Sequence, residues 1–105
     1  MDDLSTRSGL ELSVIKKIRG VFDGYPQIEK VLLYGSRAKG NYRPGSDIDL
    51  TLIGEQLTMS HLMQIENELD ELLLPYKIDL SLFHEIESRE LTDHIRRVGV
   101  VFDEK

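Results

Sequence analysis

Two aspartates separated by one residue are the first side chains in this sequence whose spacing could support chemistry. Asp47 and Asp49 lie in the run DIDLTLI, where polar and apolar residues alternate strictly, as they do in a half-buried β-strand. Both carboxylates therefore leave the same face of the strand, with their Cα atoms about 6.5 to 7 Å apart. At this spacing the two carboxylates can share metal ions.

A third aspartate, Asp79, lies in a later alternating run that predicts a strand over residues 77–83. If this strand pairs with residues 47–53, its carboxylate reaches the face that holds Asp47 and Asp49. Three adjacent carboxylates repel one another, and a hard divalent cation is the simplest way to keep all three ionised. We therefore predict that the three aspartates are catalytic and bind two Mg²⁺ ions. A solvated sheet face also explains Asp47 and Asp49 when the pair is taken alone.

A loop rich in turn residues and basic side chains precedes the aspartate pair. Gly35 allows backbone N–H groups and the Ser36 hydroxyl to approach a phosphate closely. Residues 30–43 also contain no acidic residue and four basic ones: Lys30, Arg37, Lys39 and Arg43. Loop and strand together predict a phosphate-binding loop that faces a metal site, as a triphosphate requires. The loop does not have the spacing of a Walker A motif.

Hydrophobic periodicity predicts the elements that position these residues. Helices are expected over residues 13–24, from Thr58 to before Pro75, and from a Ser88 cap to Gly99. Strands are expected over residues 30–34, 47–53, 77–83 and 100–102. This order predicts an α+β fold of α/β type, in which helices pack on a small mixed β-sheet of three or four strands. We expect a single domain, residues 1–105, with residues 1–9 forming a flexible N-terminal segment.

Composition excludes several classes of function. The chain has 105 residues and a net charge of −6, which argues against direct binding of nucleic acid. It contains no cysteine, and its three histidines lack the spacing of a zinc site. No apolar run is long enough to span a membrane, so we expect no membrane partner and a cytoplasmic location.

The run GSRAKGNYRPGSDIDL resembles the signature of the nucleotidyltransferase superfamily related to DNA polymerase β. In it, ten residues separate Gly35-Ser36 from Asp47-Ile48-Asp49. The match is closest to the prokaryotic MNT domain, the smallest branch of the superfamily. The resemblance implies the polymerase beta-like fold and Mg²⁺-dependent transfer of a nucleoside monophosphate from ATP or another nucleoside triphosphate to a hydroxyl. It also implies that Asp79 completes the site and that four residues bind the nucleotide: Gly35, Ser36, Arg37 and Ser46.

Proteins of this branch are similar to the antitoxins of toxin–antitoxin pairs, in which an MNT protein adenylylates a HEPN-type ribonuclease with ATP. The resemblance therefore implies a helical HEPN-type partner that carries the acceptor hydroxyl, in a homo- or hetero-oligomer. Two other functions remain open from the residues. One is a non-catalytic binding module that neutralises a partner protein by forming a complex with it. The other is a small Mg²⁺ phosphohydrolase, for which the sequence offers no obvious water-positioning base or nucleophile.

Overall fold

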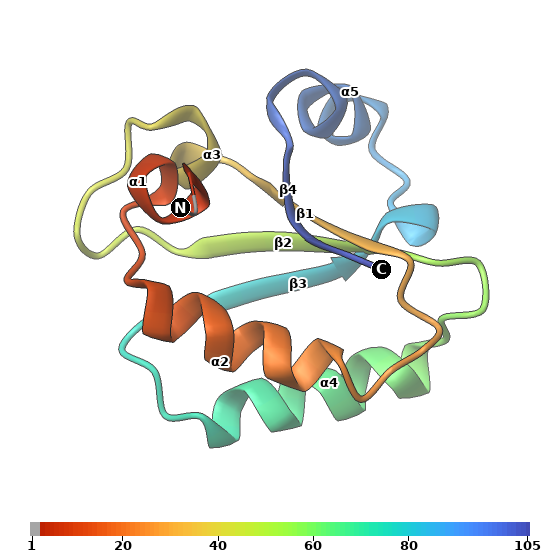
Figure 1. Cartoon of the computed structure of the whole chain (residues 1–105). Helices are drawn as coiled ribbons and strands as arrows, with labels where there is room; N and C mark the ends of the chain where they lie inside the picture. Colours follow the sequence, from red (N-terminus) through yellow and green to blue (C-terminus); the bar gives the residue numbers. More distant parts are fainter. Residues whose placement is uncertain (1–2) are drawn as a thin grey trace.

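A computed structural model describes residues 3–105 as a four-stranded mixed β-sheet with helices on both faces (Figure 1). The helices are α1 (Asp3–Ser8), α2 (Leu12–Phe22), α3 (Ser36–Lys39), α4 (Met59–Glu71), the 3₁₀ turn η1 (Phe83–Glu85) and α5 (Arg89–Val98). The strands are β1 (Lys30–Tyr34), β2 (Ile48–Ile53), β3 (Ile78–Leu82) and β4 (Val100–Glu104). The expected fold class is therefore confirmed.

The strand order in the sheet is β3-β2-β1-β4. β1 runs antiparallel to both β2 and β4, whereas β2 and β3 are parallel. The two strands expected to carry the aspartates are therefore neighbours, as the proposed convergence of their carboxylates requires. In their register Asp49 is the direct partner of Asp79.

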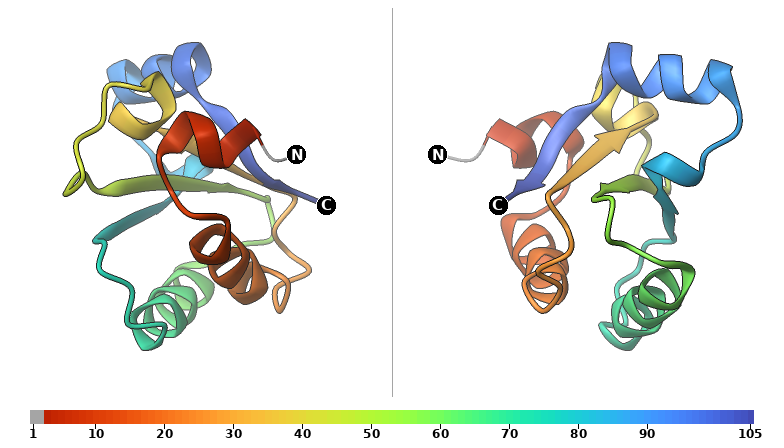
Figure 2. Two further views of the ribbon diagram at one scale, coloured as in Figure 1. Left: turned by 60° about the vertical axis from the view of Figure 1, so that its left-hand side comes forward. Right: turned by 90° about the vertical axis from the view of Figure 1, so that its right-hand side faces the viewer.

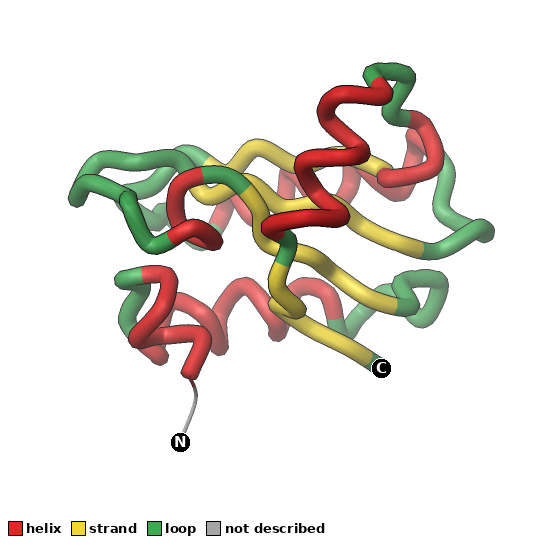
Figure 3. Tube along the Cα trace, turned by 90° about the horizontal axis from the view of Figure 1, so that it is seen from above, coloured by secondary structure: helices red, strands yellow, loops and turns green. Residues whose placement is uncertain are grey.

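One face of the sheet forms the hydrophobic core with α2 and α4, which lie side by side beneath it (Figures 1 and 2). The apolar residues of each alternating strand point to this face; Leu33, Leu50 and Leu52 are fully buried there. The polar residues of the same strands therefore point to the opposite face, which α5 covers in part (Figure 3). Within residues 3–105, no helix combines the length and apolar character needed to cross a membrane.

Side-chain caps explain where two helices begin. The Thr58 hydroxyl accepts the His61 N–H at 3.3 Å, and His61 Nδ1 accepts the Thr58 N–H at 3.0 Å. The pair forms a capping box in which a histidine replaces the usual acidic or amide residue. At α5, Ser88 accepts the Leu91 N–H at 3.2 Å, which confirms Ser88 as the predicted cap.

The N-terminal segment differs from the expectation of a flexible chain. Within the described residues, 3–8 form α1, whose Leu4 is buried and whose Ser8 is fully buried. The Arg7 Nε–H group also donates to the Ala38 carbonyl at 2.7 Å. A helix this short gains its stability from tertiary contacts rather than from local propensity, which is why its polar sequence did not reveal it. Residues 1 and 2 lie outside the described part.

We predict that Phe102→Ala lowers the free energy of unfolding by about 3–5 kcal/mol, because it leaves a cavity in a packed core. Phe102 is fully buried, and its ring lies 6.2 Å from that of Phe22 in an edge-to-face arrangement. Urea denaturation measures the loss. The matched control is Val101→Ala on the same strand, where the side chain is 46% exposed and the change should stay within about 0.5 kcal/mol. Equal losses in the two variants would contradict the packing described here.

Candidate active site

The register of β2 and β3 brings the three predicted carboxylates to one end of the sheet. Asp49 and Asp79 are direct partners on adjacent strands, and Asp47 precedes Asp49 by two residues at the entry to β2. Residues two apart on an extended chain point to the same face. Asp47 and Asp79 are exposed, whereas Asp49 is half-buried. The structure thus places all three on the polar face of the sheet.

The electrostatics of Asp49 confirm that the three groups interact. The pKa of Asp49 is raised from 3.8 to about 6, most of all by burial and then by the charges of Asp79 and Asp47, in that order. A half-buried carboxylate between two others is energetically unfavourable in its ionised form. The site therefore carries concentrated negative charge that a cation would relieve.

The donor set fits a hard divalent metal. It consists of carboxylate oxygens alone, the ligands that Mg²⁺ and Mn²⁺ prefer over softer metals. Among the described residues, no three His, Cys, Asp or Glu side chains are grouped so that they could hold a metal ion. Asp47, Asp49 and Asp79 therefore stay the predicted ligands of such a metal, on the chemistry of their oxygens and on their common face of the sheet.

Gly35 brings the loop after β1 against Asp49. Its φ of 74° and ψ of −157° lie in a region that is essentially restricted to glycine. A Cβ atom at this position would lie only 2.3 Å from Asp49 Oδ2, so no larger residue fits without moving the carboxylate. Ser36, which is half-buried, follows directly and begins α3. The predicted phosphate-binding residues Gly35 and Ser36 therefore lie beside the predicted metal ligands.

Arg37 does not take the position expected of a nucleotide contact. Its side chain is 1% exposed, and its guanidinium donates to the carbonyls of Ser8, Ser46 and Pro44. The side-chain oxygen of Ser46, also expected to contact the nucleotide, accepts the Arg43 N–H at 2.8 Å. Arg37 therefore ties loop segments together, and this placement argues against a direct phosphate contact by its side chain.

Tyr34, for which the sequence favours a packing role over a place in the site, lies next to the aspartates. Tyr34 pairs with Asp49 across β1 and β2, and its ring lies 6.2 Å from that of His94 on α5. Burial raises the pKa of the Tyr34 hydroxyl, and the charges of Asp79 and Asp49 raise it further, while a hydrogen bond with Ser81 acts in the opposite direction. Its place as the last residue of β1, directly before Gly35, brings it to this end of the sheet.

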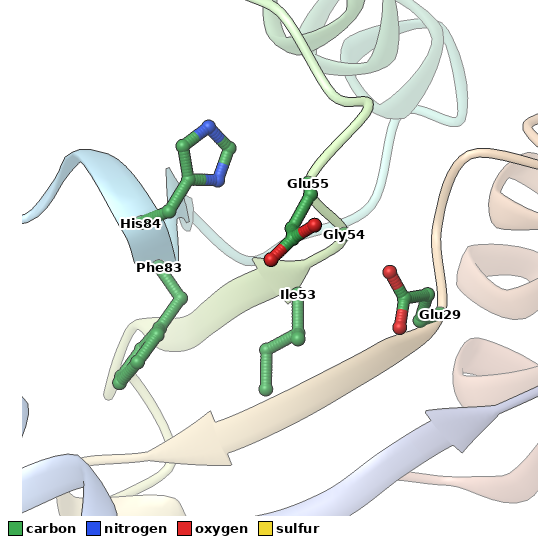
Figure 4. Close-up of a pocket in the computed structure, with 6 residues that line it drawn as sticks. All are labelled: Glu29, Ile53, Gly54, Glu55, Phe83 and His84. Atoms are coloured by element: carbon green, nitrogen blue, oxygen red, sulfur yellow. The ribbon is translucent and has the colours of Figure 1, made fainter.

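The polar face continues from the aspartates to a hollow at the other end of β2. The next pair along the strands is Thr51 and Ser81, whose side-chain oxygens lie 3.0 Å apart. Beyond it, a cavity of about 430 Å³ is lined by Glu29, Ile53, Gly54, Glu55, Phe83 and His84 (Figure 4). This cavity lies away from the aspartates, about 13 Å along β2 from Asp49 to Ile53. It is therefore distinct from the carboxylate cluster.

Comparison with known proteins confirms the expected family. A family model described as "Polymerase beta, Nucleotidyltransferase" matches residues 16–105, which include all three aspartates and the loop after β1. A comparison with curated protein sequences gave no significant match.

Several solved structures have the same fold. A toxin–antitoxin complex with AMP-PNP is 22% identical, with a TM-score of 0.70 over 87% of this chain and 73% of that one. A complex of a tri-AMPylated HEPN toxin with an MNT antitoxin, from Shewanella oneidensis, is 19% identical, with a TM-score of 0.65 over 89% and 71%. A protein from Sulfolobus solfataricus described as a putative nucleotidyltransferase is 21% identical, with a TM-score of 0.59 over 100% and 90%. At these identities the likeness shows the fold alone.

We predict that Gly35→Ala displaces the Asp49 carboxylate, because the new methyl group would collide with it. The substitution also strains the backbone by about 1–3 kcal/mol. The matched control is Gly40→Ala, since Gly40 has a φ of 87° but an added Cβ would meet nothing within 4 Å. Both variants should lose stability in urea denaturation. Only Gly35→Ala should shift the Asp49 carboxyl resonance in ¹³C NMR, and an unchanged resonance would contradict the close approach.

We also predict that Asp79→Asn lowers the pKa of Asp49 from about 6 without restoring 3.8, because burial remains the larger cause. An NMR titration of the Asp49 carboxyl group measures this shift. With its pKa raised in the folded state, Asp49 contributes stability below pH 4 that is lost as the pH rises through about 6.

Wild type should therefore lose more stability between pH 4 and pH 7 than Asp49→Asn does, as measured by urea denaturation without added metal. Asp70→Asn, which removes an exposed carboxylate on α4, is the control and should follow wild type. If Asp49→Asn also followed wild type, Asp49 would not carry the raised pKa.

Proposed function

The chain belongs to the polymerase beta nucleotidyltransferase family, and from this premise we propose that it transfers AMP from ATP to a hydroxyl group on a partner protein. The observation that supports the proposal most directly is the in-register pairing of Asp49 with Asp79 beside Gly35. The proposed reaction needs carboxylates that bind metal and a loop that a phosphate can approach closely, and Asp49 is adjacent to both Asp79 and Gly35.

In the proposed reaction the acceptor oxygen attacks the α-phosphorus of ATP and the bond to the β-phosphate oxygen breaks, which releases pyrophosphate. Asp47, Asp49 and Asp79 would hold two Mg²⁺ ions. When bound, the ions neutralise charge on the phosphates and lower the pKa of the acceptor hydroxyl. Asp79 lies on the edge strand β3 and is exposed, so it is the carboxylate best placed to face an incoming acceptor and receive its proton.

Gly35 and Ser36 would bind the triphosphate in this proposal. The positive φ of Gly35 leaves no side chain between the backbone and the site, so main-chain N–H groups can reach phosphate oxygens. The hydroxyl of Ser36 adds a further donor. We also propose that Ser46 contacts the nucleotide, because it is half-buried and directly precedes Asp47. Arg37 has a different role.

We propose a HEPN-type protein as the acceptor. The support is the shared fold with the MNT antitoxin whose complex contains a tri-AMPylated HEPN toxin, together with AMP-PNP in another toxin–antitoxin complex of the same fold. The net charge of −6 is a further argument, since it favours a protein acceptor over a nucleic acid.

We predict that incubation with a HEPN-type partner, ATP and Mg²⁺ adds a mass of one or more AMP groups to the partner, detected by intact-mass spectrometry. Asp49→Asn should reduce the increment to background, because it removes a carboxylate from the centre of the cluster. Asp70→Asn, the same change on an exposed surface of α4, is the matched control and should retain the transfer. Parallel reactions with GTP, CTP and UTP test the choice of donor.

If no increment appears while the partner is still bound and inhibited, the protein acts as a binding module without catalysis. If the increment persists in Asp49→Asn but disappears in Asp70→Asn, the site has been assigned to the wrong carboxylates.

A further inference from the structure

Among the described residues, Arg37 is the one charged side chain that is buried, and its guanidinium donates to three backbone carbonyls. Nη1 donates to the Ser8 carbonyl at 2.8 Å, Nε to the Ser46 carbonyl at 3.1 Å, and Nη2 to the Pro44 carbonyl at 3.2 Å. The guanidinium carbon also lies 5.1 Å from the centre of the Tyr42 ring and 5.0 Å from that of Tyr76. Three segments of chain therefore meet at one cation.

These contacts reach the beginnings of both strands that carry the aspartates. Ser46 immediately precedes Asp47, and Tyr76 lies two residues before β3, which carries Asp79. Because β2 and β3 are parallel, both begin at the same end of the sheet, and Arg37 lies at that end.

Asp47 is the site carboxylate whose position depends most on this arrangement. It is exposed and lies outside β2, so strand pairing does not fix it directly. The chain is nevertheless anchored on both sides of it. Before it, the Ser46 carbonyl is bound by Arg37; after it, the Ile48 N–H donates to the Lys77 carbonyl at 2.9 Å. The direction in which the Asp47 side chain points therefore depends on the hydrogen bond between Arg37 and the Ser46 carbonyl.

Only arginine can make this set of bonds. Its planar guanidinium offers donors in a rigid fork and two faces for aromatic rings, whereas lysine has a single nitrogen on a flexible stem. Among the described residues, the partners of Arg37 are carbonyl oxygens and rings rather than a carboxylate. A buried cation held in this way is costly to bury, and it persists only when its hydrogen bonds are well satisfied.

We propose that Arg37 is a positioning residue for Asp47: it orients this carboxylate for metal binding by holding the Ser46 carbonyl, without touching metal or nucleotide itself. The inference rests on the proposed function, since it assumes that Asp47 is a metal ligand. It also assigns a role to α1, whose last carbonyl, that of Ser8, is the partner of Nη1.

The test is a titration of wild-type protein and variants with Mn²⁺ alone, followed by electron paramagnetic resonance of the free ion. We expect Arg37→Lys to weaken Mn²⁺ binding by about tenfold or more, as is typical when a group that orients a metal ligand is lost. Asp49→Asn should abolish the same binding and thereby identifies the site.

Arg19→Lys is the matched control for a general loss of stability. Arg19 is a half-buried arginine on α2, the helix that packs on the core face of the sheet. It donates to the Phe102 carbonyl at 2.8 Å and lies 5.6 Å from the centre of the Phe102 ring. Both variants should lower the melting temperature, but Arg19→Lys should bind Mn²⁺ as wild type does. Wild-type affinity in folded Arg37→Lys, or an equal loss in Arg19→Lys, would overturn the positioning role.

Tyr42→Leu provides a second variant if Arg37→Lys does not fold. It removes one ring face and leaves the three hydrogen bonds in place, so we expect Mn²⁺ binding to weaken by only about two- to fivefold. An unchanged affinity would count against the inference. Absence of Mn²⁺ binding to wild type would instead overturn the proposed metal-dependent function, and the inference would fall with it.

Discussion

The parallel pairing of β2 with β3 is the constraint on which the site depends. It places Asp49 beside Asp79 although the two carboxylates repel each other; after burial, the charge of Asp79 is the next cause of the raised pKa of Asp49. The pairing is maintained from the opposite face, where Leu50 and Leu80 are direct partners in the core. Burial of each such side chain contributes about 1.5–3 kcal/mol, which offsets the unfavourable electrostatics. The core and the site are thus the two faces of the same strand pair.

Strand pairing does not fix the phosphate-binding loop or Asp47; the geometry of the loop after β1 does. Gly35 brings the chain against Asp49 because it has no side chain, and Arg37, two residues later, holds the carbonyl before Asp47. The short segment after β1 therefore contacts Asp49 itself and the backbone directly before Asp47. This explains why the predicted phosphate-binding loop lies so close to the aspartates in space.

Alternation and periodicity in the sequence were sufficient to predict the strands, the main helices and the face that the aspartates share. They could not show whether a charged side chain turns inward, which is why Arg37 was expected at the nucleotide and lies instead in the interior. They also could not show α1, whose stability depends on Leu4 and Arg7 contacting the rest of the fold. Both features depend on tertiary contacts, which leave no periodic pattern in the sequence.

The parallel arrangement also has a consequence for the order of folding. Parallel neighbours cannot be joined by a tight turn, so the chain between Ile53 and Ile78 must pass through α4 before β3 reaches its place. Closing a connection of this length costs entropy before any contact between the strands repays it, and such non-local pairs slow folding. The antiparallel pair β1 and β2 has a shorter connection and is expected to form earlier. The carboxylate cluster would then be completed only in the late steps of folding, so partly folded chains would lack it.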